Sequence, residues 1–459
     1  MTPSREPGLI RRGVFWLLLL GPFFFLSYGL TNQYTAGRSD VGSLVFSWEN
    51  HLPLWPWTII PYWSIDVLYG LSFLLPRTRQ EMDRHALSLL SAQVICVACF
   101  LLWPLRFTFE RPELGGLFGW LFDVLMGFDK PFNQAPSLHI ALLVIIWTMF
   151  ARHVRRQPWR WVMHGWMLLI GVSVLTTWQH HFIDVPTGAL AGFVCLWLWG
   201  IRWRDVGCAR VPKRWWVAVS YAAGSLVIAG LAFTLGGSGL WLLWPATSLL
   251  LVALNYGVVG ASGFQKGADG RLSNAACWLL APYLIGAWGN SRLWTWRHPQ
   301  ADEVCDGVFL GRIPGFGEGQ SFKAMVDLCA ELPCNTCAGL IADKSAPTGI
   351  AKPVGADLSA MRPAQVPYIS LPTLDLIAPD SHLLREAAEA IESLRRQGPL
   401  LVCCALGYSR SASAVAAWLL LTGRCKNLDD AEALIRQARP GIVLRAAHRQ
   451  ALSQLGTHP

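Results

Sequence analysis

The chain of 459 residues is poor in charge, since only 15% of its residues are charged and 53% are hydrophobic. It has no run of Lys and Arg interleaved with aromatic residues, so we expect no nucleic-acid partner. Its 12 cysteines lack the regular spacing of a disulfide framework. Cys334 and Cys337 form a CxxC without a second pair at zinc spacing, so we predict ordinary thiols in a reducing compartment and no metal site.

Hydrophobic residues are concentrated in the first part of the chain. Residues 1–290 are almost entirely apolar with short basic breaks, whereas residues 300–459 have the composition of a soluble domain. A run of about 20 apolar residues is long enough to cross a bilayer. No small-residue cleavage site follows the first run, so we predict a membrane helix there rather than a signal peptide. The predicted spans are Gly13–Leu30, Pro56–Leu75, His85–Leu105, Ser137–Arg152, Val162–Trp178, Val185–Ile201, Trp215–Leu235 and Gly239–Val259.

The basic breaks predict the orientation of these spans. Residues 76–84, 152–160 and 202–214 are rich in Arg and Lys, which favours a cytoplasmic location for these loops and for the N-terminus. We expect a multi-pass protein of a bacterial inner (plasma) membrane with its C-terminal domain in the cytoplasm. A weaker apolar run at 275–296 is predicted to lie on the cytoplasmic surface; if it spans instead, the last domain lies outside.

The outer ends of these spans bring ionisable residues to one depth. They lie in Arg106–Pro112, Asp129–His139 and Thr177–Gly188, and ionisable residues at a membrane boundary indicate a functional site. His180 and Asp184 are four residues apart and share one face of a helix. A carboxylate beside an imidazole fixes its tautomer and raises its basicity. The alternative is that His180 and His181 are interfacial anchors and that His139 is solvated.

These residues resemble the type-2 phosphatidic acid phosphatase (PAP2) superfamily over residues 50–205. The sequence Pro136-Ser137-Leu138-His139 resembles its second motif, and His180 with Asp184 resembles the end of its third. The resemblance implies that His180 is the nucleophile and forms a phosphohistidine. Asp184 would orient it, and His139 would protonate the leaving group.

The phosphate-binding positions of that family are only partly present. Arg111 is followed by the proline of the first motif, and Arg106 could take the place of the lysine of that motif. Val174 stands where the third motif has arginine. The Pro-Ser-Leu-His form is nearest to the branch of inositol-phosphoceramide and sphingomyelin synthases. The membrane half could therefore transfer a phospholipid headgroup to an alcohol instead of hydrolysing a phosphate.

The stretch LLVCCALGYSRSASA, residues 400–414, predicts a strand, a tight loop and a helix. Gly407 permits a sharp turn in the loop. The amides of a loop that enters a helix bind anions, and a helix N-terminus lowers the pKa of a thiol such as Cys404. Arg410 adds a planar fork that matches phosphate oxygens. Thiolate, amides and guanidinium are together suited to attack on phosphorus, whereas the alternative is a buried structural cysteine.

The remainder of the soluble half alternates strands with helices, which predicts an α/β domain with a largely parallel sheet. We predict strands at VFLGRI, AGLIAD, PYISLP and LLVC. Helices are predicted from Ser321, from Ser381 with Asp380 or Ser381 as its cap, and near residues 409–422, 428–438 and 445–455.

This half resembles the dual-specificity branch of the protein tyrosine phosphatase superfamily over residues 302–456, in the motifs DGVFLGR, YISLPTLD, CALGYSRS and ARPGIVL. The resemblance implies Cys404 as nucleophile and Arg410 as phosphate clamp, with Gly407 in the phosphate-binding loop. Ser411 would help the thiolate leave and Asp375 would be the general acid. Asp380 is a weaker candidate for the acid and is favoured as the helix cap. Cys403 stands where the family has histidine.

The residues of the phosphate-binding loop bear on the charge of the substrate. Residues 405–409 contain no Lys or Arg, which favours a singly phosphorylated substrate, either a phosphoprotein or a lipid phosphate. Attachment to the bilayer raises the effective concentration of a lipid substrate.

The sequence thus predicts a multi-pass α-helical membrane domain, a PAP2-like bundle, followed by an α/β dual-specificity phosphatase domain. The expected parts are a first membrane helix and outer loop (1–50), a PAP2-like core (51–205), further membrane helices with an interfacial linker (206–300) and the phosphatase (301–459). We expect a bifunctional phosphatase of lipid phosphates without a cofactor. The alternatives are a headgroup transferase fused to a protein phosphatase, and a scaffold in which one half has lost activity.

Overall fold

The computed structural model describes residues 5–201, 212–315, 318, 321–334 and 367–456. The chain divides into two compact units, Met1–Gly200 and Ile201–Pro459, which are described separately. The predicted strand AGLIAD and Cys337 lie outside the described residues.

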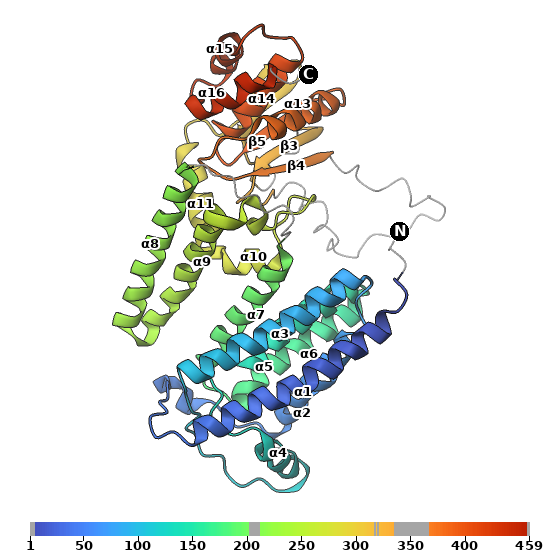
Figure 1. Ribbon diagram of the computed structural model, residues 1–459, viewed down its shortest axis with the longest axis vertical. Coiled ribbons are helices and arrows are strands. Elements are labelled where there is room, and N and C mark those ends of the chain that lie inside the picture. Colours follow the sequence, from blue (N-terminus) through green and yellow to red (C-terminus); the bar gives the residue numbers. More distant parts are fainter. Residues whose placement is uncertain (1–4, 202–211, 316–317, 319–320, 335–366, 457–459) are drawn as a thin grey trace, which may run out of the picture. The chain divides into compact units, whose positions relative to one another are not determined.

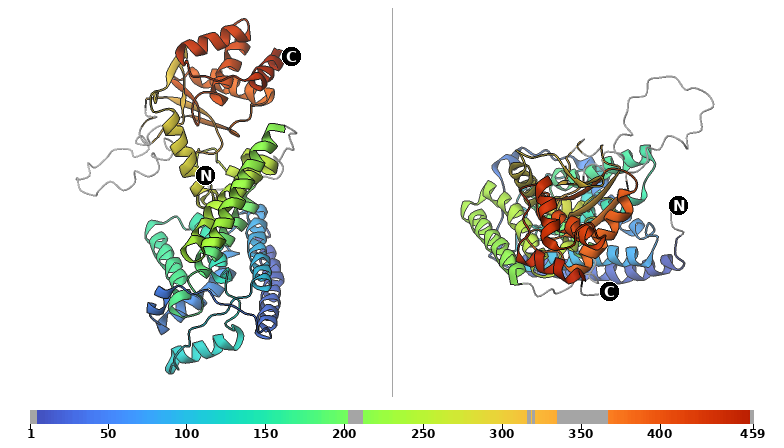
Figure 2. Two further views of the ribbon diagram at one scale, coloured as in Figure 1. Left: turned by 90° about the vertical axis from the view of Figure 1, so that its left-hand side faces the viewer. Right: turned by 90° about the horizontal axis from the view of Figure 1, so that it is seen from above.

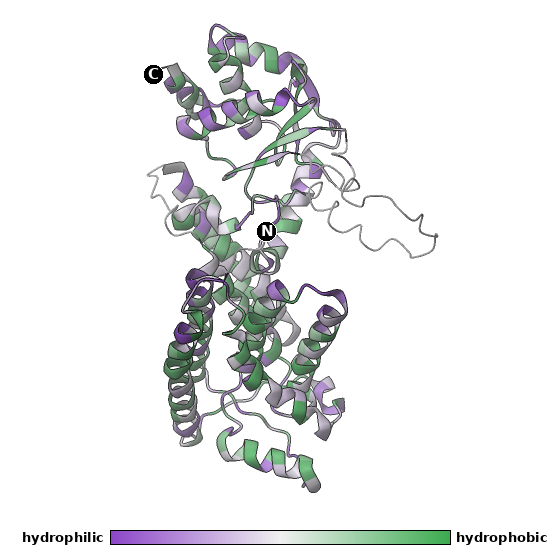
Figure 3. Ribbon diagram, turned by 90° about the vertical axis from the view of Figure 1, so that its right-hand side faces the viewer, coloured by the Kyte–Doolittle hydropathy of each residue, from purple (hydrophilic) through white to green (hydrophobic). Residues whose placement is uncertain are grey.

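Unit 1 is a bundle of helices around an apolar core (Figure 1). The predicted spans of this unit each overlap a helix, and α4 was not predicted. The helices are α1 Leu9–Ala36, α2 Ile59–Ser72, α3 Arg79–Leu102, α4 Gly116–Phe128, α5 Leu138–His153, α6 Gln157–Thr176 and α7 Asp184–Gly200. In Figure 3 hydrophobic colouring runs along these helices, whereas the helices of the C-terminal domain alternate between polar and apolar residues.

Unit 2 begins with a helical hairpin, in which α8 packs along α9 (Figures 1 and 2). Its helical elements are α8 Pro212–Leu235, η4 Gly237–Leu242, α9 Leu243–Leu254, the π-helical turn η5 Asn255–Val259, η6 Ala261–Phe264, α10 Asn274–Leu279 and α11 Ala281–Trp294. Among the described residues, 4 helical segments are long and apolar enough to cross a membrane: Leu9–Ala36, Arg79–Leu102, Arg214–Leu235 and Gly237–Val259.

The second part of unit 2 is the predicted α/β domain. Its strands have the order β1-β2-β5-β3-β4, and only β1 is antiparallel to its neighbour. The strands are β1 Asp302–Cys305, β2 Val308–Arg312, β3 Ala324–Cys329, β4 Tyr368–Thr373 and β5 Leu400–Cys404. One face of the sheet packs against helices (Figure 1), which are α13 Ser381–Arg395, α14 Arg410–Leu421, α15 Leu428–Ala438 and α16 Ala446–Ser453.

The helix predicted from Ser321 is wrong, because this segment forms the strand β3. All residues of β3 are buried, and the strand has neighbours on both sides. A strand covered on both faces has no polar–apolar alternation, so its apolar run can be taken for a helix. Its one charged residue, Asp327, is buried because it forms an ion pair with Lys266. Strand β1 was not predicted.

The second face of the sheet is covered partly by α11. Met325, Cys329, Leu401 and Cys403 form an apolar cluster on this face, against which Ala287 of α11 packs. The helix predicted over 275–296 is divided at Leu280 into α10 and α11. The division has a local cause: a proline in the first turn of α11, where its missing N–H is tolerated, would clash with a continuous preceding helix.

Candidate active sites

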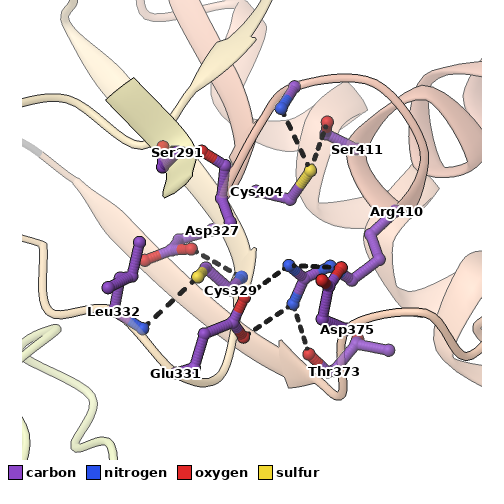
Figure 4. A network of polar contacts seen from close by, with 12 residues as sticks. Ser291, Asp327, Cys329, Glu331, Leu332, Thr373, Asp375, Cys404, Arg410 and Ser411 are labelled. Carbon is purple, nitrogen blue, oxygen red and sulfur yellow. Dashed lines mark hydrogen bonds and ion pairs between the residues drawn. The ribbon is translucent and has the colours of Figure 1, made fainter. Parts of the chain in front are cut away.

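Cys404 lies at the end of β5, and the loop that follows leads into α14 at Arg410 (Figure 4). Its Sγ lies 3.1 Å from Ser411 Oγ and accepts the N–H of Gly407 at 3.3 Å. The sulfur therefore sits at the N-terminus of α14, where the Gly407 amide and the Ser411 hydroxyl face it.

Gly407 is required by the close approach of this loop to β2. It has a φ of +76°, in the left-handed region, and a Cβ there would lie 2.4 Å from the carbonyl carbon of Gly311. Any side chain at residue 407 would push the loop away from the sheet. The loop conformation thus depends on a glycine, as the sequence indicates.

Arg410 is held by two carboxylates, those of Glu331 and Asp375 (Figure 4). Its Nη2 and Nη1 donate to Glu331 Oε1 at 2.6 Å and Oε2 at 2.8 Å, and Nη1 donates to Thr373 O at 2.7 Å. The side chains of Arg410 and Glu331 are only 2% and 4% exposed. A bidentate pair of this kind fixes the plane of the guanidinium.

Glu331 was missed by the sequence analysis. Burial alone would raise its pKa, but the charge and hydrogen bonds of Arg410 hold the pKa of Glu331 below its usual value. The residue lies just beyond β3. A correct prediction of that strand would have placed Glu331 at the same sheet edge as Cys404, because β3 and β5 are parallel neighbours.

Asp375 lies just after β4, and its Oδ1 is 3.1 Å from Arg410 Nη2. Its side chain is 38% exposed, so the carboxyl group is accessible to solvent. Asp380 instead caps α13, because its Oδ1 accepts the N–H of Leu383 at 2.8 Å. Cys403 points to the second face of the sheet, where burial raises the pKa of its thiol. Of these residues, Asp375 is therefore the exposed carboxyl group next to Arg410.

The predicted histidine site of unit 1 also has a definite geometry. His180 Nδ1 lies 3.1 Å from Asp184 Oδ2, and its Nε2 lies 3.1 Å from Ser137 Oγ. The backbone N–H of Ser137 bonds Asp184 O at 3.0 Å, so the segments before α5 and α7 are joined directly. All three side chains are buried. Ser137 is 43 positions from His180 in the sequence, but its contacts join it to His180 and Asp184 in one cluster.

His139 stacks on Tyr62, with ring centroids 4.2 Å apart. Its Nε2 is buried and has no hydrogen-bond partner in the described structure. The Tyr62 hydroxyl lies 3.4 Å from Asp129 Oδ2, and the Tyr28 hydroxyl donates to Asp129 Oδ1 at 2.7 Å. The tyrosines and the buried role of Asp129 were not predicted.

The two arginines that the resemblance implies as phosphate ligands, Arg111 and Arg106, differ in position. Arg111 Nη2 donates to the carbonyl oxygens of Thr177 and Trp178, each at 3.0 Å, so it lies beside the segment that carries His180. Arg106 is exposed, and none of the described side-chain contacts joins it to this cluster. Phosphate binding by Arg106 would need a different side-chain position.

A second pair of a histidine and a carboxylate lies next to His180 and Asp184 and was not predicted. His181 Nδ1 is 3.0 Å from Glu49 Oε2, and both side chains are at most 2% exposed. Glu49 also accepts the N–H of Phe182 at 2.9 Å. These contacts fix the turn before α7. Among the described residues, no group of at least 3 His, Cys, Asp or Glu side chains is arranged to hold a metal ion.

Comparisons with known proteins concern the C-terminal domain. Residues 356–458 match the family model described as dual specificity phosphatase, catalytic domain. Among solved structures, Tk-PTP in the active form is 24% identical, with 35% of this chain and 99% of that chain covered and a TM-score of 0.26. PTPMT1 in complex with PI(5)P is 18% identical, with coverages of 34% and 93% and a TM-score of 0.26. Human DUSP28 is 20% identical, with coverages of 34% and 96% and a TM-score of 0.26. No curated protein matches the chain.

Proposed function

We propose that this chain, which contains a dual specificity phosphatase catalytic domain and is a phosphoric monoester hydrolase, removes phosphate from lipids such as phospholipids or polyprenyl phosphates. One observation carries the proposal. The nucleophile Cys404, with Ser411 and Gly407 around its sulfur, belongs to the same unit as the candidate spans of α8 and α9. A catalytic domain joined to a membrane anchor meets lipid substrates at high effective concentration.

In the proposed reaction the Cys404 thiolate attacks phosphorus and displaces the lipid alcohol, so that an S–P bond forms as the P–O bond breaks. Asp375 gives its proton to the leaving oxygen. Water then attacks the thiophosphate, Asp375 takes the proton from it, and the thiolate is released to the hydroxyl donor of Ser411, 3.1 Å away. Arg410 and the loop amides balance the charge on the phosphoryl oxygens.

The contact between Asp375 and Arg410 suggests how substrate prepares the acid. Without substrate, the carboxylate lies 3.1 Å from the guanidinium. A phosphate dianion bound to Arg410 competes with that carboxylate for the guanidinium. Substrate binding thereby frees the Asp375 side chain to face the leaving oxygen.

A second phosphotransfer centre in unit 1 is favoured by the His180 cluster. We propose that His180 Nε2 attacks phosphorus, while Asp184 holds Nδ1 at 3.1 Å and Ser137 lies beside the nucleophilic nitrogen. A carboxylate partner selects the tautomer that leaves Nε2 free to attack. His139, with its unpaired Nε2, is the group available to protonate the leaving oxygen. The acceptor is water in a phosphatase, or an alcohol in a headgroup transferase.

The proposed membrane arrangement follows the basic loops. The bilayer would be a bacterial inner membrane, with the His180 centre at the outer side and the Cys404 centre in the cytoplasm. In that arrangement the centres serve opposite leaflets. They would act on separate lipid pools rather than in sequence on one bound molecule.

Phosphate release from phosphorylated lipids in proteoliposomes tests the proposal. Wild type is compared with Cys404→Ser and His180→Ala, and Cys425→Ser is a matched cysteine control outside both centres. If each catalytic substitution abolishes release from a different lipid, both centres are phosphatases. If His180→Ala changes no release but abolishes headgroup exchange onto an added alcohol, unit 1 is a transferase. Unchanged release in Cys404→Ser would refute the proposed nucleophile, and phosphoprotein as the preferred substrate would refute the lipid assignment.

A further inference from the structure

The helical hairpin of unit 2 reaches the catalytic loops of the phosphatase. The hydroxyl of Tyr256, in the turn after α9, donates to the backbone oxygen of Asp375 at 3.1 Å. The Asp375 carboxylate in turn lies 3.1 Å from Arg410. Tyr256 is only 1% exposed and belongs to the candidate span Gly237–Val259. A residue outside the α/β domain therefore contacts the loop that carries the proposed general acid.

The backbone around Tyr256 is itself held in place. The last carbonyl groups of a helix lack partners within that helix, and here Arg214 of α8 supplies them. Its guanidinium donates to Tyr256 O, to Asn255 O at 3.4 Å and to Val258 O at 3.3 Å. A cation at a helix C-terminus also interacts favourably with the helix dipole. Both helices of the hairpin thus fix the position of the phenol.

Aromatic contacts extend this support to α11. Tyr221 of α8 stacks on Tyr256 with ring centroids 5.7 Å apart, and Tyr283 of α11 meets Tyr221 edge-on at 5.8 Å. Burial, together with the neighbouring Tyr256 phenol and the Glu331 carboxylate, raises the pKa of Tyr283. The aromatic cluster therefore lies beside the carboxylates of the catalytic pocket.

Two further residues join the same region of the chain to the remaining catalytic loops. Lys266 Nζ donates to Cys329 O and Leu332 O, each at 2.7 Å, on either side of Glu331. Ser291 of α11 donates to the oxygen of Ala405, the residue after the nucleophile, at 2.5 Å (Figure 4). The loops of the nucleophile, of the arginine clamp and of the acid each have a partner from the residues that precede the sheet.

We propose that Tyr256 is a positioning residue for the general acid, supplied by the membrane hairpin. Its hydroxyl holds the Asp375 backbone so that the carboxyl proton reaches the leaving oxygen as the S–P bond forms and the P–O bond breaks. The inference rests on the proposed phosphatase reaction and deepens it. Arg214 begins one candidate span and Val259 ends the other, so Tyr256 lies at the membrane boundary and the substrate is a phosphate ester presented at the bilayer surface.

Leaving-group dependence distinguishes positioning of the acid from general support of the fold. An alkyl ester needs a proton on its leaving oxygen, whereas p-nitrophenolate leaves without one. We would measure kcat/KM, which reports formation of the thiophosphate and not its hydrolysis, for the full chain carrying His180→Ala in phosphatidylcholine vesicles with phosphatidic acid, butyl phosphate and p-nitrophenyl phosphate. Since general acid catalysis contributes roughly 10²–10⁴-fold, we expect Tyr256→Phe to lower kcat/KM about tenfold for the alkyl esters and less than about twofold for the aryl ester.

The controls are Tyr221→Phe, from the same aromatic cluster, and the double variant Tyr256→Phe/Asp375→Asn. The first should leave all rates unchanged. The second should be no slower than Asp375→Asn alone, because Tyr256 acts through Asp375. Equal losses on alkyl and aryl esters, or a further loss in the Asp375→Asn background, would overturn the proposed role of Tyr256.

The comparison of phosphatidic acid with butyl phosphate separates this inference from the proposed function. Hydrolysis of butyl phosphate without hydrolysis of phosphatidic acid would refute the lipid substrate, and the comparison of alkyl with aryl ester would still decide the role of Tyr256. Hydrolysis of phosphatidic acid with equal losses in Tyr256→Phe would refute that role and leave the lipid phosphatase standing. Absence of release from every ester in the wild type would refute both.

Discussion

Replacing Glu331 with glutamine tests whether a buried ion pair holds Arg410, the proposed phosphate clamp. Both oxygens of Glu331 accept hydrogen bonds from Arg410, at 2.6 and 2.8 Å. Glutamine keeps the shape of the side chain but removes its charge and offers one oxygen instead of two. The buried guanidinium would retain Thr373 O and the more exposed Asp375 carboxylate as partners.

The expected cost follows from the burial of the pair. Removing one partner of a buried ion pair costs roughly 3–5 kcal/mol, because the other charge stays buried. Since Arg410 keeps other acceptors, we expect the lower end, about 3 kcal/mol. Because 1.4 kcal/mol corresponds to a factor of ten, local opening should become on the order of 100-fold more frequent.

Amide hydrogen exchange of the full chain measures this opening without isolating the domain. We expect faster exchange of the slowest amides in β5 and α14, which carry Cys404 and Arg410. Asp429→Asn is the matched control, because Asp429 is 80% exposed in its ion pair with Arg449. Exposed pairs contribute little to stability, so this variant should exchange like the wild type.

The stabilisation by the ion pair of Glu331 and Arg410 depends on pH in a defined direction. The pKa of Glu331 is lower in the folded chain than its usual value, which is about 4.3 for an unfolded glutamate. Its stabilisation is therefore present above about pH 4.3 and is lost as the pH falls through the folded value. Protection of wild type and Glu331→Gln should converge on acidification. Equal protection at pH 7, or a difference that does not shrink in acid, would refute the assignment.

Other substitutions test separate parts of the structure. Gly407→Ala places a Cβ 2.4 Å from the backbone of β2, so phosphate release should fall; normal release would mean that the loop has room to move. Lys266→Met leaves Asp327 buried without its ion pair, at a cost of roughly 3–5 kcal/mol, so heat should inactivate the phosphatase at a lower temperature. Asp184→Asn should abolish the activity that depends on His180 and spare Cys404-dependent release; loss of both would indicate a folding defect.

The part of the site that lies within one stretch of sequence was predictable. Cys404, Gly407, Arg410 and Ser411 lie on a strand, a loop and a helix that are contiguous in the chain, and their contacts follow from that local geometry. The histidine cluster was predictable in part. His180 and Asp184 are close in sequence, whereas the stacking of His139 on a tyrosine depends on how α2 and α5 pack.

Residues that contact the loops around Cys404 from distant parts of the chain could not be found from the local sequence pattern. Glu331 follows a strand that was taken for a helix, because a strand buried on both faces has no alternating pattern. Tyr256 and Lys266 lie in or near an apolar run whose composition indicates only a membrane segment. Their hydrogen bonds cross 119 and 61 positions of sequence, and no local pattern encodes contacts of that range.

Because of these contacts, we expect the phosphatase domain to need the helices that precede it in the chain. A chain shortened to residues 301–459 would expose the cluster around Met325 and Cys403, against which Ala287 packs. It would also leave Asp327 fully buried without Lys266. An unpaired buried charge and an uncovered sheet face both favour unfolding or association. We expect this shortened chain to aggregate, and a chain of residues 201–459 in detergent to hydrolyse p-nitrophenyl phosphate like the full protein. A monomeric 301–459 fragment with full activity, measured by gel filtration and kcat, would show that the preceding helices are only an anchor.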